Sequence, residues 1–255
     1  MMKLFNYQGN EIHNFASVYA GKTLSILGDS ISTFAGYIPS GNKVWYTGSN
    51  NGVYSVNDTW WMKLMNALGM SLLVNNSWSG SRVTTTRGNG ESGCYSRCEN
   101  LGTNPDVIIV YMGINDFNNG VGIGTYDGTG DFPTVTTTFR EAYAIMLNKI
   151  LTKYPGAEVW ACTLPYCEWT GENTFPEVNG NGVTLDTWNE AIRDLAALFG
   201  VKVLEHAKCG LTYQNMNRYM GDYASGEGLH PNAAGHSLIA NHDIRQMDAS
   251  VLMRY

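Results

Sequence analysis

The chain has 255 residues, of which 44% are hydrophobic and 15% are charged. This composition excludes a disordered chain and a coiled coil, and the length suits one α/β domain that buries about 70% of the surface of its unfolded chain. The formal net charge is −6 and no cluster of Lys and Arg occurs, which argues against a surface that follows nucleic-acid phosphates.

The N-terminal residues 1–20 are polar and aperiodic, and we expect a lead-in segment there, followed by a single domain over 21–255. No apolar region of a signal peptide is visible, and no apolar run is long enough to cross a membrane. We therefore expect a soluble protein, either cytoplasmic or trimmed from a secreted or larger precursor. Its oligomeric state stays open.

The five cysteines do not have the spacing of a structural zinc site. They are Cys94, Cys98, Cys162, Cys167 and Cys209. Buried thiols are the favoured interpretation, with disulfides between sequence neighbours as the alternative. We expect no metal.

Short apolar runs alternate along the chain with stretches of helical periodicity. Strands are predicted over 23–27, 72–75, 106–112, 158–164 and 201–204. Helices are predicted over 58–68, 138–154, 186–199 and 231–247, the last with Pro231 at its start. This alternation predicts an α/β fold, a three-layer α/β/α sandwich with a five-stranded parallel sheet.

Ligands of open parallel sheets collect at the carboxyl ends of the strands. Ser30, Gly80 and Asn115 each follow a predicted strand, and all three are small or polar. His230 comes directly before Pro231, so we expect it in extended backbone from which its ring can reach a neighbouring loop.

Four motifs at these positions resemble the conserved blocks of the SGNH hydrolases, also called GDSL-type esterases and lipases. They are Ile-Leu-Gly-Asp-Ser at 26–30, Ser-Trp-Ser-Gly at 77–80, Val-Tyr-Met-Gly-Ile-Asn-Asp at 110–116, and Glu-Gly-Leu-His-Pro-Asn at 227–232 with Gly235 and His236. Each motif alone is weak, but four in the family's order span nearly the whole chain. The resemblance implies the flavodoxin-like SGNH fold and a serine esterase without a cofactor.

The resemblance also implies a role for each motif. Ser30 would be the nucleophile and His230 the base that takes its proton. The backbone N–H groups of Ser30 and Gly80 and the side-chain amide of Asn115 would stabilise the oxyanion. Asp116 is interpreted as a brace of its loop, and Trp78, Asp29 and Tyr166 are expected to contact the substrate.

One position departs from the family pattern. Where the family usually has Asp three residues before the histidine, this chain has Glu227. Because Glu carries the same charge and acceptors, we expect Glu227 to orient the ring of His230. Asp222, five residues earlier, and a backbone carbonyl are the alternatives.

Aromatic residues are the clue to the substrate. Trp78, Tyr166 and Trp169 lie in loops near the predicted site, where flat rings could stack on sugar faces. We expect a small-molecule or glycan ester, in particular a short acyl group such as O-acetyl on carbohydrate. The alternatives are a lysophospholipase or thioesterase of the same family, and a non-catalytic carbohydrate-binding module on this fold.

Overall fold

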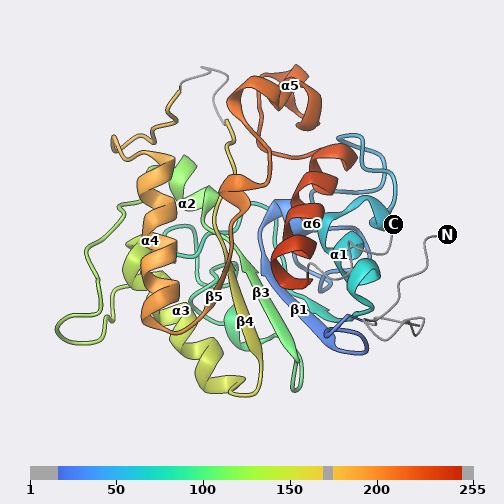
Figure 1. Ribbon diagram of the computed structural model, residues 1–255. Coiled ribbons are helices and arrows are strands. Elements are labelled where there is room, and N and C mark those ends of the chain that lie inside the picture. The colour runs from blue at the N-terminus through green and yellow to red at the C-terminus, as the bar shows by residue number, and fades with distance from the viewer. Residues whose placement is uncertain (1–16, 169–174, 249–255) are drawn as a thin grey trace, which may run out of the picture.

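A single parallel sheet forms the centre of the computed structural model, which describes residues 17–168 and 175–248 (Figure 1). Its strands are β1 (Thr23–Gly28), β2 (Ser71–Asn75), β3 (Val107–Tyr111), β4 (Glu158–Cys162) and β5 (Lys202–Leu204). They are hydrogen-bonded in the order β2-β1-β3-β4-β5, and every pair is parallel. This is the flavodoxin-like order, so the predicted fold class is confirmed.

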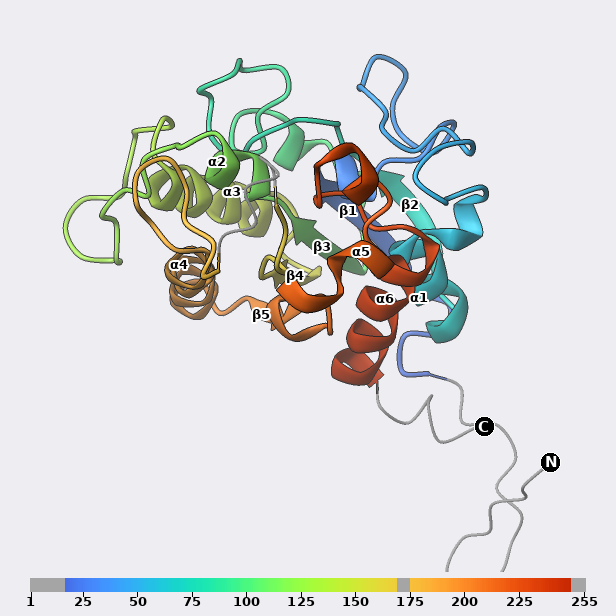
Figure 2. The same cartoon turned by 90° about the horizontal axis from the view of Figure 1, so that it is seen from above.

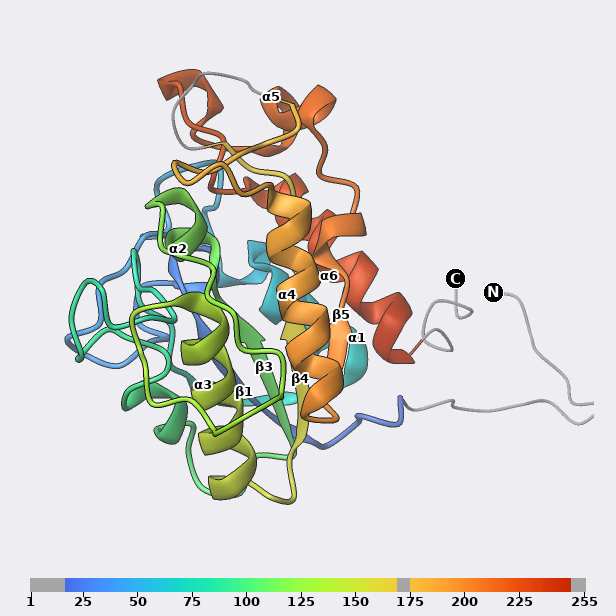
Figure 3. The same ribbon diagram turned by 90° about the vertical axis from the view of Figure 1, so that its left-hand side faces the viewer.

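Helices cover both faces of the sheet. Helices α1 (Trp60–Leu68) and α6 (Ala233–Asp248) pack against each other on one face, and α3 (Phe139–Lys153) and α4 (Leu185–Leu198) pack together on the other. Figure 3 shows α3 and α4 in front of the sheet and α6 behind it. The arrangement is the three-layer sandwich that the alternating pattern predicted.

The central strand β3 explains why the sheet needs two helical layers. All five of its residues are buried, as expected for a continuous apolar run covered on both faces. The edge strand β2 instead alternates between more and less exposed residues along Ser71–Asn75. The core therefore extends over both faces of the sheet at β3 and thins at β2.

Two short helices and one helix start differ from the prediction. Helices α2 (Ile114–Asn118) and α5 (Met216–Tyr219) were not predicted, because five and four residues are too few to show a helical period. The prediction that Pro231 begins the last helix was wrong. The Asn232 side chain caps α6 by accepting hydrogen bonds from the N–H groups of Ala234 and Gly235.

Polar groups at the start of the described chain are bonded to the domain. Ser17 Oγ donates to Asp248 Oδ2 at 2.7 Å, and Tyr19 Oη donates to Glu158 Oε1 at 2.5 Å. All five cysteines are buried and free, as expected. Among the described residues, no helix is both long enough and apolar enough to span a bilayer.

The strand order creates a switch point between β1 and β3. The chain leaves β1 toward β2 on one side, and β3 lies on the other side. A crevice opens outside the carboxyl ends of the strands at such a point. Seen from above those ends, α2 and α5 lie on either side of β1 and β3 (Figure 2). Ser30 lies two residues after the end of β1, which puts it at the carboxyl edge of the sheet beside this switch point.

Candidate active site

Ser30 begins a single 3-10 turn, Ser30–Ser32, immediately after β1. The Asp29 side chain caps this turn by accepting the N–H of Ile31 at 3.0 Å. Close packing explains the glycine at position 28, because a Cβ there would lie 2.6 Å from Ser77 Oγ. The strand end thus delivers Ser30 in one fixed orientation.

A chain of hydrogen bonds joins Ser30 to a histidine and a carboxylate that lie about 200 residues away. His230 Nε2 lies 2.8 Å from Ser30 Oγ, and His230 Nδ1 lies 2.6 Å from Asp222 Oδ2. All three side chains are at most 5% exposed. This geometry allows the imidazole to take the hydroxyl proton at Nε2 while a carboxylate holds the other ring nitrogen.

The expectation that Glu227 bonds the ring of His230 is corrected by this geometry. Asp222 takes that place, and its carboxylate also accepts the backbone N–H groups of Leu229 and His230 at 3.0 to 3.2 Å. These bonds clamp Asp222 against the segment that carries the histidine. The Glu227 side chain lies nearby without bonding the ring, beyond the left-handed turn at Gly226 (φ +87°).

Three donors lie on the segments that follow β1, β2 and β3. Within the described ranges, the backbone N–H groups of Ser30 and Gly80 have no hydrogen-bond acceptor. Asn115 Nδ2 donates one hydrogen to the Ser81 carbonyl at 3.0 Å, which leaves its second N–H for a ligand. Such preorganised donors are what a developing oxyanion requires.

Gly80 has a left-handed backbone conformation, which favours glycine, and it lies against the flexible end of Arg87. Its φ is +80°, and a Cβ would lie 2.4 Å from Nη1 of Arg87. That guanidinium donates to the Gly80 carbonyl at 2.8 Å. The Gly80 carbonyl therefore accepts a hydrogen bond from Arg87, while the Gly80 N–H has no acceptor among the described residues.

Asp29 is a buried structural group, which corrects the expectation that it contacts the substrate. It is 0% exposed, and burial raises the pKa of its carboxyl to about 7. The N–H of Ile31 and the buried Arg97 guanidinium oppose that rise. Arg97 donates to the carbonyls of Gly28 and Asn76, so it ties the ends of β1 and β2 together.

Asp116 braces the loop after β2, and not its own loop as expected. Its carboxylate accepts the backbone N–H groups of Val83 and Thr84 at 2.7 and 3.0 Å, and the Thr84 hydroxyl at 2.7 Å. Burial raises the pKa of Asp116 to about 6 despite these bonds. Because Asn115 precedes it on α2, the brace also holds the amide of Asn115 near Gly80.

Trp45 is a site residue that the sequence analysis did not identify. Its ring stacks on that of His230, with centroids 3.7 Å apart and planes 11° apart. The Trp45 backbone N–H donates to Thr33 Oγ1 at 2.9 Å, which ties this loop to the turn after Ser30. No local sequence signal joins positions 45 and 230, since the contact arises only from the fold.

The other predicted substrate contacts lie apart from this hydrogen-bonded chain. The Trp78 backbone N–H donates to the Gly28 carbonyl at 3.1 Å, and its side chain is partly exposed. Tyr166 is also partly exposed and lines a separate cavity beyond β4. Trp169 lies outside the described residues.

Asp222, Glu227 and His230 could in principle hold a cation, since each offers a ligand atom within 4.8 Å of the others. Asp222 and His230 are, however, already bonded to one another. His230 is also bonded to Ser30, and Asp222 accepts the backbone N–H groups of Leu229 and His230. These contacts fit the hydrogen-bonded chain, and we derive no metal site from the group.

Comparison with known proteins relates the whole domain to one family. Residues 22–168 match the model of the family described as GDSL-like lipase/acylhydrolase. This range includes Ser30, Gly80 and Asn115 but ends before His230. No curated protein matches the sequence.

Several solved structures resemble the chain over about nine-tenths of its length. A putative GDSL-like lipase from Bacteroides ovatus is 28% identical over 91% of this chain and 100% of its own, with a TM-score of 0.67. One from Bacteroides uniformis is 25% identical over 90% and 96%, with a TM-score of 0.66. A carbohydrate esterase family 2 enzyme from Corynascus shares the fold at 17% identity, over 96% of this chain and 70% of its own, with a TM-score of 0.53.

Proposed function

The chain belongs to the GDSL-like lipase/acylhydrolase family of hydrolases, and from that premise we propose that it is a serine esterase that removes short acyl groups, in particular O-acetyl groups on carbohydrate. The observation that carries the proposal is the hydrogen-bonded chain from Ser30 through His230 to Asp222. The backbone N–H groups of Ser30 and Gly80 and the second amide N–H of Asn115 accompany it. Ester hydrolysis needs all of these parts in one place.

In the acylation step, Ser30 Oγ attacks the carbonyl carbon of the ester as its proton moves to His230 Nε2. The carbonyl oxygen becomes an oxyanion, which the N–H groups of Ser30 and Gly80 and the Asn115 amide stabilise. The C–O bond of the ester then breaks, and the leaving alcohol takes the proton from His230. An acyl-enzyme on Ser30 remains.

In the deacylation step, water takes the place of the alcohol. His230 Nε2 accepts a proton from the water as its oxygen attacks the acyl carbon. The second tetrahedral intermediate collapses, the carboxylic acid leaves, and Ser30 Oγ recovers its proton from His230. Asp222 keeps Nδ1 protonated and stabilises the imidazolium in both steps.

Two features support a short acyl group and a carbohydrate alcohol. Arg87 donates to the Gly80 carbonyl on the loop after β2, and Trp45 covers one face of His230. Aromatic residues crowd the same rim, and flat rings can stack on the apolar faces of sugars. A carbohydrate esterase is among the solved structures that share this fold, which agrees with the proposal.

A p-nitrophenyl ester series from acetate to octanoate tests the proposal directly. We expect kcat/KM to be highest for acetate and to fall with chain length, and we expect Ser30→Ala to abolish turnover. Release of acetate from acetylated xylan and acetylated cellulose oligomers then tests the alcohol. A preference for octanoate would favour the lysophospholipase or thioesterase alternative, and folded protein without turnover on any ester would favour the binding module.

A further inference from the structure

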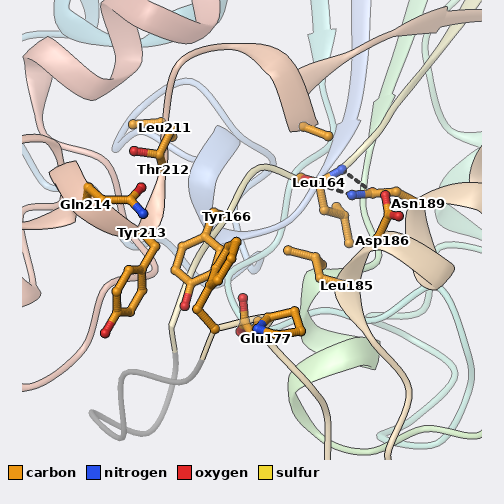
Figure 4. Close-up of a pocket in the computed structure, with 13 residues that line it drawn as sticks. Leu164, Tyr166, Glu177, Leu185, Asp186, Asn189, Leu211, Thr212, Tyr213 and Gln214 are labelled. Atoms are coloured by element: carbon orange, nitrogen blue, oxygen red, sulfur yellow. Dashed lines mark hydrogen bonds between the residues drawn. The ribbon is translucent and has the colours of Figure 1, made fainter.

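A second cavity lies on the same rim as Ser30, at the carboxyl ends of β4 and β5. It has a volume of about 490 Å³, within the range of ligand pockets. Its walls include Leu164, Tyr166, Glu177, Leu185, Tyr213 and Gln214, which come from four separate segments (Figure 4). None of its described lining residues is Lys, Arg or His.

Three aromatic rings form one side of this cavity. Tyr166, Phe175 and Tyr213 lie with their centroids 5.6 to 6.1 Å apart, so each ring contacts the other two. Phe175 is nevertheless 68% exposed. An aromatic side chain held by two others while it still faces solvent offers a flat apolar surface to a ligand.

Glu177 adds a polar group to this apolar lining. Glu177 is 9% exposed, and its carboxyl oxygens lie 3.4 Å from the backbone N of Cys167 and 3.8 Å from its Sγ. Burial raises its pKa to about 8, so the carboxyl is protonated and neutral at pH 7. In that form it can both donate and accept a hydrogen bond.

Backbone hydrogen bonds connect a segment next to the cavity to the segment that carries His230. Glu168 and Gly228 exchange two backbone hydrogen bonds, at 3.0 and 2.8 Å, and Gly228 lies two residues before His230. Glu168 closely follows Tyr166, which faces the cavity. This isolated bridge therefore connects the segment that carries Tyr166 to the segment that carries His230.

The lining selects among ligand classes by its charge and polarity. An anionic headgroup or free carboxylate finds no cation there. An acyl chain would lie against polar groups of the lining, which include Glu177, Asp186, Asn189, Thr212 and Gln214. A sugar offers apolar C–H faces to the rings and hydroxyls to the polar groups. A sugar carries no charge, so it can hydrogen-bond the protonated carboxyl of Glu177 without an ion pair.

We infer that this cavity is a second sugar subsite, which binds a ring of an oligosaccharide whose acyl ester lies at Ser30. The inference rests on the proposed function and extends it, because it makes the substrate an oligomer instead of a monosaccharide. The rings of Phe175 and Tyr213 would bind the sugar face, and Glu177 would bond a hydroxyl.

Kinetics on an acetylated series of xylose, xylobiose and xylotetraose, with the glucose series beside it, tests the inference. In the wild type we expect KM to fall about 10-fold from monosaccharide to tetrasaccharide. Phe175→Ala and Tyr213→Ala should each raise KM for the tetrasaccharide about 10-fold relative to KM for the monosaccharide on the same variant. Phe132→Ala is the matched control, since Phe132 is 46% exposed and does not line the cavity.

Binding measured without turnover separates this inference from the proposed function. Calorimetry of Ser30→Ala with unacetylated xylotetraose and cellotetraose should show binding to at least one of them, and adding Phe175→Ala should weaken it about 10-fold. If esters are hydrolysed but neither KM nor binding responds to Phe175 and Tyr213, the subsite is overturned while the esterase stands. A response confined to p-nitrophenyl octanoate would also overturn it, in favour of an acyl-chain site.

Discussion

The indole ring of Trp45 lies flat against the imidazole of His230, with 3.7 Å between centroids and 11° between planes. The bonds from His230 to Asp222 and Ser30 hold its two ring nitrogens, but the ring could still rotate about the line between them. Stacking on Trp45 prevents that rotation and so fixes the plane of the ring. An indole face also attracts the positive charge that the imidazole acquires when it takes the serine proton. Trp45 is thus a positioning residue for His230.

Removal of this ring should lower activity without loss of the fold. We expect Trp45→Ala to reduce kcat on p-nitrophenyl acetate about 10-fold, the upper range for one aromatic pair. Trp45→Phe should recover most of that loss, because a phenyl ring can still stack. Saturation kinetics gives kcat, and the melting temperature of each variant is the control. Equal kcat for Trp45→Ala and wild type would contradict the positioning role.

A matched pair of substitutions distinguishes the two carboxylates near His230. Asp222→Asn should lower kcat about 10⁴-fold, because an amide facing Nδ1 favours the wrong tautomer of the ring. Glu227→Gln removes the same charge close by but breaks no bond to the ring, so its kcat should stay within about 10-fold of wild type. Stopped assays at high enzyme concentration can measure both. The reverse order of losses would restore Glu227 as the partner of His230.

The amide of Asn115 should matter more in the transition state than in substrate binding. We expect Asn115→Ala to lower kcat about 10² to 10³-fold with a smaller change in KM, as for loss of one oxyanion donor. Asn118→Ala on the same short helix is the control, since within the described chain the Asn118 Nδ2 has no hydrogen-bond partner. A similar loss of kcat for Asn115→Ala and Asn118→Ala would contradict a specific role for the Asn115 amide.

Burial of His236 predicts a specific loss of stability in acid. Burial lowers its pKa to about 3, because the neutral ring is fully buried and its Nδ1 accepts the N–H of Trp60 at 3.2 Å. Its unfolded pKa is about 6.5, so the unfolded state binds the proton first as the pH falls. This contribution to stability is complete above about pH 6.5 and is lost between about pH 6.5 and 3.

Urea unfolding at pH 7, 6, 5 and 4 measures that loss. By linkage the His236 contribution amounts to about 3 kcal/mol between pH 7 and 4. His236→Asn keeps an acceptor near Nδ1 but does not titrate, so its free energy of unfolding should fall less steeply with acid than that of wild type. The difference between the two slopes isolates His236 from the buried carboxyls, whose raised pKa values act in the opposite direction. Parallel slopes would show that His236 is not buried in its neutral form.

Much of the fold could be read from local patterns. The apolar run at Val107–Tyr111 predicted a central strand, and it is buried at every residue, because a strand covered on both faces must be apolar along its length. Helical periodicity predicted a helix over 138–154, and α3 is Phe139–Lys153. Short elements such as α2 were missed, since five residues contain little more than one helical turn.

The site divides in the same way. Ser30, Gly80 and Asn115 follow strand ends, and parallel strands bring their carboxyl ends to one edge, so the sequence by itself predicted that these residues meet. The partner of His230 is different. Asp222 and Glu227 are both close to it in sequence, and only the backbone bonds of residues 229 and 230 to Asp222 decided between them.

The sequence by itself therefore determined the family, the sheet and the three motifs that follow strands, because each depends on a local period or a short spacing. Only the tertiary structure decided that Asp222 bonds His230, that Trp45 covers its ring, and that Asp29 is buried. Those features depend on how long loops return to the rim of the sheet. The path of such a loop is set by contacts with distant segments, which no local pattern encodes.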